Sequence, residues 1–436
     1  MRYRLLVLSV SLPPFVVLVG CGESNSNHDS KASPSKPTSN DGGDAAAGAC
    51  AGMPLLGLKY SPGGDVLPHP CDPFDPVTNN PYAIRCIDAM PDFKTPYPGD
   101  EFCILPPPPD QGIQIGVHPQ GSDYWARMSA GDYSGYADAA RTEPFEVKPG
   151  SEVNQTYDDI ASNAESHDYF RLDSRMRPGS HHLVSFFNEL PDAVRGWEPV
   201  SGDAFSRIAA SPGLYNVQST HSDRPAALSV APEDEGLGAT FPAKPVISFQ
   251  VHLINTDVEP LLREVWLNIW WLPGDRKAAA PVTPGVSLAN VDYPPNQLID
   301  NVGSYAPTAD TRIVSIFGHR HAWTTRFSAE LVRASGETTE MYDSFNWLEM
   351  PTYQLDSLTQ NPPADVAAQR DGALSGLTIL HPGDQIKYHC YVDTTQRQAD
   401  ALHVPVPSAN LMFANEAIGA EMCVLYLEIA PMTMTQ

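Results

Sequence analysis

Five short segments of the chain combine β-branched, aromatic and aliphatic residues in the manner of β-strands. They are Val246–Ile254 (VISFQVHLI), Val265–Trp271 (VWLNIWW), Arg312–Trp323 (RIVSIFGHRHAW), Gln385–Val392 (QIKYHCYV) and Met422–Ile429 (MCVLYLEI). Turn signals such as Pro273-Gly274-Asp275 and Pro382-Gly383-Asp384 separate them. With 43 prolines, about twice the usual share, long helices are disfavoured as well. We therefore expect an all-β fold.

The spacing of these segments suits two antiparallel β-sandwiches. We expect an N-terminal sandwich at 110–285, a linker at 286–305 and a C-terminal sandwich at 306–436. A Cys- and Pro-rich region at 49–109 precedes them and ends in a run of prolines, Pro106–Pro109, which is typical of a stiff polyproline spacer. The hydrophobic share of 42% is enough to build cores of this size.

The first residues have the pattern of an export signal. Arg2 and Arg4 precede an apolar run, Leu5–Val19, that is too short to span a membrane. Leu18-Val19-Gly20-Cys21 resembles the bacterial lipobox, whose cysteine is acylated, so we expect a signal peptide at 1–20 and a lipid-anchored Cys21. The alternative is a general secretory signal with a chance cysteine. Gly22, in place of Asp, favours the outer membrane of the cell envelope by the enterobacterial sorting preference.

Residues 21–48 are mostly Ser, Asn, Asp, Gly, Lys and Pro, a composition typical of a flexible tether. Its histidine, His28, is expected to be a solvated bystander. The net charge of −25 argues against nucleic acid as a partner, because binding to phosphates requires a basic surface. An acidic surface is common in exported proteins and does not identify a substrate.

The cysteines other than Cys21 form an even set of six, which an exported chain is expected to oxidise. Their count alone does not choose among the possible pairings. Clustering favours Cys390 with Cys423, and the remainder among themselves. Those remaining are Cys50, Cys71, Cys86 and Cys103.

Histidines at strand positions are the candidates for chemistry. Alternation places His319 and His321 on one strand face, about 7 Å apart at Cα. His252 lies on the polar face of its strand, opposite the apolar residues. His181 and His182 are neighbours, so both face one ion only if the backbone bends after the preceding Pro-Gly turn. Each feature alone is also compatible with ordinary surface histidines.

Met422 lies on the strand face opposite Cys423. A disulfide from Cys423 to Cys390 on the core face would hold Met422 toward the other face. A single methionine is usually core filler, so this position gains weight only together with the histidines.

Taken in order, these strings resemble the copper type II, ascorbate-dependent monooxygenases, the family of dopamine β-monooxygenase and peptidylglycine α-hydroxylating monooxygenase. The resemblance covers roughly residues 111–432. The matching strings are Gly179-Ser180-His181-His182, Gln250-Val251-His252, His319-Arg320-His321, His381-Pro382-Gly383-Asp384 leading to Cys390, and Glu421-Met422-Cys423-Val424-Leu425-Tyr426.

The resemblance implies two jelly-roll-like domains that face each other across a solvent-filled cleft and carry one copper each. It implies that the first, electron-storing copper is bound by His181, His182 and His252. It implies that the second, oxygen-activating copper is bound by His319, His321 and Met422. Ascorbate or another one-electron donor would reduce both ions, and O₂ would be used to hydroxylate an sp³ C–H bond of a small molecule.

The sequence departs from the peptide-hydroxylating members at the substrate pocket. Their carboxylate-binding Arg and Asn are replaced here by Phe317 and Val424, whereas the tyrosine of the same motif is retained as Tyr426. Peptide amidation is therefore disfavoured, and a more apolar substrate pocket is expected. Other nearby histidines, namely His381, His389 and His403, have no matching ligand position and are expected to have surface or supporting roles.

Two alternatives remain open. The chain could be a copper-binding or copper-handling envelope lipoprotein without turnover, and zinc would suit three imidazoles equally well at the first site. It could also be a binding module that uses the sandwich cleft and its aromatic residues for a carbohydrate or protein ligand, with the histidines incidental. The tryptophans available for this are Trp270, Trp271, Trp323 and Trp347, although tryptophan in a β-sandwich more often lies in the core.

Overall fold

The computed structural model describes residues 84–119, 124–188, 196–198, 213–218, 221–225, 237–255, 257–274, 280–281, 283–345, 347–348, 350, 352–354, 379–414 and 416–431. The expected signal peptide, lipid-anchored Cys21 and tether, together with His28, Cys50 and Cys71, lie outside these residues. None of the helices in the described part of the chain has the length and hydropathy needed to cross a membrane.

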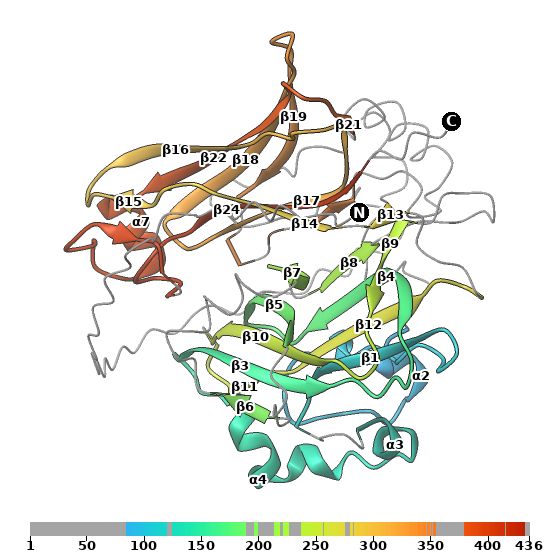
Figure 1. The fold of residues 1–436 in the computed structure, drawn as a ribbon. Coiled ribbons are helices and arrows are strands. Elements are labelled where there is room, and N and C mark those ends of the chain that lie inside the picture. Colours follow the sequence, from blue (N-terminus) through green and yellow to red (C-terminus); the bar gives the residue numbers. More distant parts are fainter. Residues whose placement is uncertain are drawn as a thin grey trace, which may run out of the picture. The chain divides into compact units, whose positions relative to one another are not determined.

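The first half of the fold is a sandwich of two sheets (Figure 1). One sheet has the order β1-β12-β4-β9-β13, with β8 also beside β4, and the other has the order β6-β3-β10-β5-β7. The pairs are antiparallel except for the short β9–β13 pair. The strands are β1 (Gly112–Val117), β2 (Glu146–Val147), β3 (Glu152–Ile160), β4 (His167–Met176), β5 (Ser180–Asn188), β6 (Gly196–Glu198), β7 (Gly213–Val217), β8 (His221–Pro225), β9 (Leu237–Phe241), β10 (Val246–Ile254), β11 (Leu261–Leu262), β12 (Val265–Trp271) and β13 (Ala280–Pro281).

The second half is a separate sandwich with its own core. Its sheets have the orders β14-β24-β17-β20, with β21 also beside β17, and β16-β22-β18-β19. The strands are β14 (Thr283–Leu288), β15 (Asp292–Tyr293), β16 (Leu298–Tyr305), β17 (Thr311–Arg320), β18 (Thr324–Val332), β19 (Thr338–Ser344), β20 (Tyr353–Gln354), β21 (Ile379–Leu380), β22 (Gln385–Asp393), β23 (Leu411–Met412) and β24 (Cys423–Pro431). The expected all-β architecture of two sandwiches is confirmed.

Helices are short and lie mainly in the connections. They are α2 (Cys86–Ala89), α3 (Tyr124–Ser129), α4 (Ala139–Thr142), α7 (Gln396–Leu402) and the 3₁₀ turns Asp100–Phe102, Ser134–Ala137 and Glu143–Phe145. This agrees with the high proline content, which interrupts helical hydrogen bonding.

Strand β10 shows why the alternating pattern specifies a sandwich. Ile247, Phe249 and Val251 are fully buried in the core of the first half. The residues between them point to the other face of the sheet, where His252 lies. The hydrophobic face thus fixes which side of the strand presents the histidine.

The segment 286–305, where we expected a linker, consists largely of paired strands. Its residues lie largely in β14, β15 and β16, of which β14 pairs with β24 and β16 pairs with β22. Both β14 and β16 lie at the edges of their sheets. Edge strands tolerate proline and exposed residues, because one of their sides is not paired with another strand. Pro284 in β14 and the exposed Leu298 in β16 therefore gave a pattern that resembles a loop.

Two disulfides are present in the described part of the chain. Cys390 of β22 bonds Cys423 of β24, with their Cα atoms 6.0 Å apart, so the bond joins the two sheets of the second half. Cys86 bonds Cys103 in the segment that precedes the first sandwich. Both agree with the expected clustering of the pairs.

Candidate metal centre

The five histidines and the methionine expected as ligands converge in the structure. The ring centroids of His181 and His182 lie 5.0 and 4.9 Å from that of His252. The rings of His319 and His321 are 5.4 Å apart, and His319 Nε2 lies 3.1 Å from the sulfur of Met422. All six side chains are buried, with at most 6% of the residue exposed.

A β-bulge explains how two adjacent histidines share one side of a sheet. His182 is directly opposite His252, but the next pair joins Leu253 to Ser180, so His181 is the extra residue. A bulge re-aims a side chain by breaking the alternation of a strand. This is the backbone bend that the His181-His182 pair requires, and it places both rings beside His252.

The second set of ligands lies where β17 ends and β24 begins. His319 and Arg320 pair with Val424 and Cys423, and His321 follows directly after the last residue of β17. Met422 precedes Cys423, which is fixed to Cys390 by the disulfide. The bond therefore holds the start of β24, and with it Met422, at the end of β17 that carries the histidines.

The grouping of the ligands differs from the two sites expected across a solvent-filled cleft. His181, from the first half, has its ring 5.5 Å from that of His319 and 5.3 Å from that of His321. Ligand nitrogens of these three residues all lie within 4.8 Å of one another. Rings of the two sets are in contact, so the structure brings both ligand sets into one buried histidine cluster.

Two polar residues that we did not predict from the sequence link the cluster to both halves. Gln218 Nε2 lies 3.2 Å from His181 Nδ1 and donates to the carbonyl of Arg320 at 2.8 Å. Glu152 Oε1 lies 2.7 Å from His252 Nε2 and accepts from the backbone N–H of Ala417 at 2.8 Å. Each is a single polar residue outside any motif, so no sequence signal marked it. These hydrogen bonds join the two halves beside the cluster, where the two ligand sets are in contact.

The remaining ring nitrogens are available for a metal. His181 Nε2, His182 Nδ1 and His252 Nδ1 are buried and have no hydrogen-bond partner in the described part of the chain. Burial, followed by the charges of neighbouring histidines, holds the pKa of His181 and His182 well below the usual value. A buried, neutral imidazole with an unsatisfied nitrogen is the form that ligates a metal.

The pKa values of His319 and His321, in the second half, are lowered as well. Burial holds the pKa of His319 well below the usual value. Burial and the neighbouring His252 lower the pKa of His321 to about 3, although nearby backbone carbonyls favour its protonated form. Both rings are therefore neutral at pH 7.

A buried carboxylate supports the backbone around His321. Glu421 accepts hydrogen bonds from the N–H groups of His321, Trp323 and Thr324, at 2.5 to 3.0 Å. Burial raises the pKa of Glu421 to about 7, against the backbone hydrogen bonds that lower it. Because Glu421 immediately precedes Met422, one carboxyl group links the positions of two candidate ligands.

The predicted substrate-binding residues lie beside the second ligand set. Phe317 and Tyr426 stack with their rings 4.8 Å apart, and the ring of Tyr426 is 6.4 Å from that of His319. Val424 pairs with His319 across the two strands. Burial raises the pKa of Tyr426 to about 12, so its hydroxyl stays protonated at neutral pH.

Other histidines and the tryptophans lie outside the ligand set. His381 and His389 pair with Asp310 and Asp300, and His403 ends α7 in a left-handed conformation. The ring of Trp347 contacts that of His181, with centroids 5.3 Å apart. The other three tryptophans considered as binding residues are buried, namely Trp270, Trp271 and Trp323.

Comparison with known proteins does not assign the chain to a family. No family model matches it, and no curated protein matches it either. Among solved structures it is similar to a chain from the atomic structure of Sulfolobus Turreted Icosahedral Virus, at 11% identity and a TM-score of 0.22. That match covers 66% of this chain and 87% of the viral one, and a TM-score this low carries no functional argument.

Proposed function

We propose that this protein is a copper-dependent monooxygenase that hydroxylates an sp³ C–H bond of a small organic molecule, with O₂ and a one-electron reductant such as ascorbate. The observation that carries the proposal is the convergence of neutral, buried imidazoles with the thioether of Met422. Imidazole suits both oxidation states of copper, and a thioether is a soft ligand that selects Cu(I). This donor set fits copper better than it fits zinc.

The residues divide into two sets by the half of the fold that supplies them. His181, His182 and His252 would hold the electron-storing copper. The oxygen-activating copper would be held by His319, His321 and Met422. When bound, the two ions supply one-electron transfer and activation of dioxygen.

The chain itself orients the ligands and shapes the pocket. Glu152 holds the proton on His252 Nε2, which directs the lone pair of Nδ1 toward an ion. Burial acts to raise the pKa of Glu152, but hydrogen bonds from His252 and Ala417 outweigh it, so the group is ionised and able to accept that proton. Phe317, Val424 and Tyr426 would line the substrate pocket, whose apolar character would suit a substrate that presents a C–H bond.

A copper-binding or copper-handling protein without turnover is the second candidate. One observation favours it: nitrogens of His181, His319 and His321 lie close enough to bind a single ion from both halves at once. A closed, buried set of three imidazoles leaves less room for O₂ than a site with an open position, and it also suits zinc. In either case we propose that the protein lies in the bacterial cell envelope, where a lipid on Cys21 of the lipobox-like motif would anchor it to the outer membrane.

Metal content and ascorbate-driven oxygen uptake test the proposal together. We expect two coppers per chain in the wild type, and loss of oxygen uptake in both His252→Ala and Met422→Ala. His389→Ala is the matched control, because His389 pairs with Asp300 outside the cluster. One copper without oxygen uptake favours the handling protein. Full uptake in either ligand variant contradicts the proposed mechanism.

A further inference from the structure

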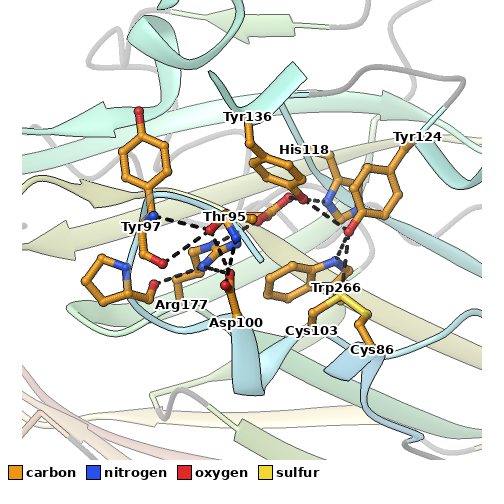
Figure 2. A network of polar contacts seen from close by, with 12 residues as sticks. Cys86, Thr95, Tyr97, Asp100, Cys103, His118, Tyr124, Tyr136, Arg177 and Trp266 are labelled. Carbon is orange, nitrogen blue, oxygen red and sulfur yellow. Dashed lines mark hydrogen bonds and ion pairs between the residues drawn. A yellow bond between two sulfur atoms is a disulfide. The ribbon is translucent and has the colours of Figure 1, made fainter. Parts of the chain in front are cut away.

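A buried ion pair lies directly before the histidine pair of the first half. Arg177 and Glu264 are both fully buried, and Arg177 Nε donates to Glu264 Oε2 at 2.8 Å (Figure 2). Arg177 begins the turn that leads from β4 into β5, only four residues before His181. What holds Arg177 therefore acts on the start of the strand that carries the candidate ligands.

The disulfide segment, residues 84–105, holds the other side of the same guanidinium. Arg177 donates from NH1 to Asp100 Oδ1 at 3.0 Å and to the carbonyl of Pro98 at 2.9 Å. Asp100 is fixed in turn by Thr95, whose hydroxyl and backbone N–H both donate to its carboxylate. The Cys86–Cys103 bond closes the loop that contains these residues.

Close packing reinforces these hydrogen bonds. Gly99 has a φ of +100°, and a Cβ added there would lie 2.3 Å from Pro178 Cδ. The backbone of the disulfide segment thus lies directly against the proline of the turn. Only glycine allows this approach, because any other residue would clash with Pro178.

The turn leads directly into the bulge, and backbone hydrogen bonds hold it in place. Ser180 N donates to the carbonyl of Arg177 at 3.3 Å, and Ile254 N donates to that of Gly179 at 2.8 Å. Gly179 has a φ of +83°, and an added Cβ would lie 2.5 Å from Leu261 Cδ1. Since His181 is the extra residue of the bulge that follows, the position of this turn sets the position of His181.

Glu264 is itself held by aromatic residues of the first half. Tyr136 donates to Glu264 Oε1 at 2.6 Å. The hydroxyl of Tyr136 lies 3.3 Å from that of Tyr124, which accepts from Trp266 Nε1 at 2.8 Å (Figure 2). Removing two charges from water is costly, and apolar replacements of buried ion pairs are often as stable. An ion pair that is held from both sides at this turn therefore points to a role in placing the backbone.

We propose that the disulfide segment is a clamp for the first metal site, in which Arg177 is a positioning residue that sets the turn before His181 and His182 through Asp100 and Glu264. This gives residues 84–105 a role in the metal chemistry of the first half. The inference rests on the proposed function for the identity of the metal. The clamp itself is a property of the backbone.

Arg177→Lys tests the clamp, with Arg171→Lys as its matched control. Lysine keeps the charge but loses the planar fork that bonds Glu264 and Asp100 together. Arg171 is also buried and pairs with Asp173 at 2.8 Å, on the same strand but away from the turn. Asp100→Asn is the milder second variant, because Asp100 is partly exposed. We expect the Asp100→Asn protein to fold even if the Arg177→Lys protein does not.

The readouts are Cu(I) affinity of the full chain, by competition with a chelator, and hydrogen exchange of the metal-free protein over residues 177–183. We expect Arg177→Lys to lower the affinity for one of two coppers about tenfold, as outer-shell substitutions do, and to leave the other unchanged. Exchange should speed up in Arg177→Lys and, less so, in Asp100→Asn, but not in Arg171→Lys.

The two proposals fail in different ways. If the wild type binds no copper, the proposed function is wrong, and hydrogen exchange alone decides the clamp. If the wild type binds copper but both clamp variants match Arg171→Lys in affinity and exchange, the clamp is overturned and the proposed function stands. Equal weakening of both coppers also overturns it, because that would be general destabilisation.

Discussion

At the scale of single residues, the cluster is defined by buried ring nitrogens that have no hydrogen-bond partner within the described residues. His182 and His252 each leave Nδ1 buried and unbonded, and Met422 places its sulfur against His319. Burying polar atoms without partners costs free energy, so native structures rarely retain them without a function. We predicted these residues as ligands from the sequence, and the structure brings their side chains together; that they bind a metal stays a prediction. The sequence did not predict Gln218 or Glu152, because single polar residues carry no spacing pattern.

Acid should destabilise the metal-free protein through its buried histidines. An unfolded imidazole takes up a proton near pH 6.5, whereas His321 does so only at about 3 in the folded protein. Between these values the unfolded state binds more protons, so stability is lost as the pH falls, by up to about 1.4 kcal/mol per pH unit for each such histidine.

Urea unfolding at pH 7, 6 and 5 measures this dependence. His321→Asn should show a shallower loss than the wild type, since it has one titrating group fewer. A metal-free wild type whose stability is constant or rises over this range would show that the histidines are not buried in their neutral form.

Replacing Glu421 with Gln should weaken the second ligand set. The carboxylate accepts from the N–H groups of Trp323 and Thr324 through one oxygen, and a glutamine amide at that position would place donor against donor. We expect a loss of about 1–3 kcal/mol in the free energy of unfolding. Glu330→Gln, at the surface, is the control and should cost less than about 1 kcal/mol. Equal effects of the two substitutions would rule out the supporting role of Glu421.

At the scale of elements, the bulge in β5 and the junction of β17 with β24 place the ligands. Alternation correctly assigned the apolar face of β10, and the clustering of the cysteines gave the partner of Cys423. Alternation did not show how His181 and His182 share a side, because a bulge depends on the pairing of two strands distant in sequence. It also missed β14 and β16, whose edge positions permit proline and exposed apolar residues.

Two glycine substitutions separate backbone strain from crowding at the bulge. Gly179 and Gly274 both have positive φ, but a Cβ at Gly274 meets open space, whereas one at Gly179 meets Leu261. We expect Gly274→Ala to cost about 1–2 kcal/mol from conformation alone. Gly179→Ala should cost clearly more and should also weaken copper binding. Chemical unfolding and copper titration of both variants provide the comparison, and equal losses of stability would contradict the tight turn before His181.

At the scale of the whole molecule, two sandwiches with separate cores contribute ligands to one cluster. The sequence was sufficient for the fold class because the strand pattern depends on local alternation. The sequence could not predict the distance between the two ligand sets, because that distance depends on contacts between the two halves. Gln218 and Glu152 make such contacts, and they bring His181 beside His319.

X-ray absorption at the copper edge of the ascorbate-reduced protein tests the ligand set most directly. We predict copper–nitrogen scattering from imidazoles together with a copper–sulfur path from Met422, and loss of the sulfur path alone in Met422→Ala. A reduced wild type that binds copper with nitrogen and oxygen scattering only, and no sulfur, would contradict the account.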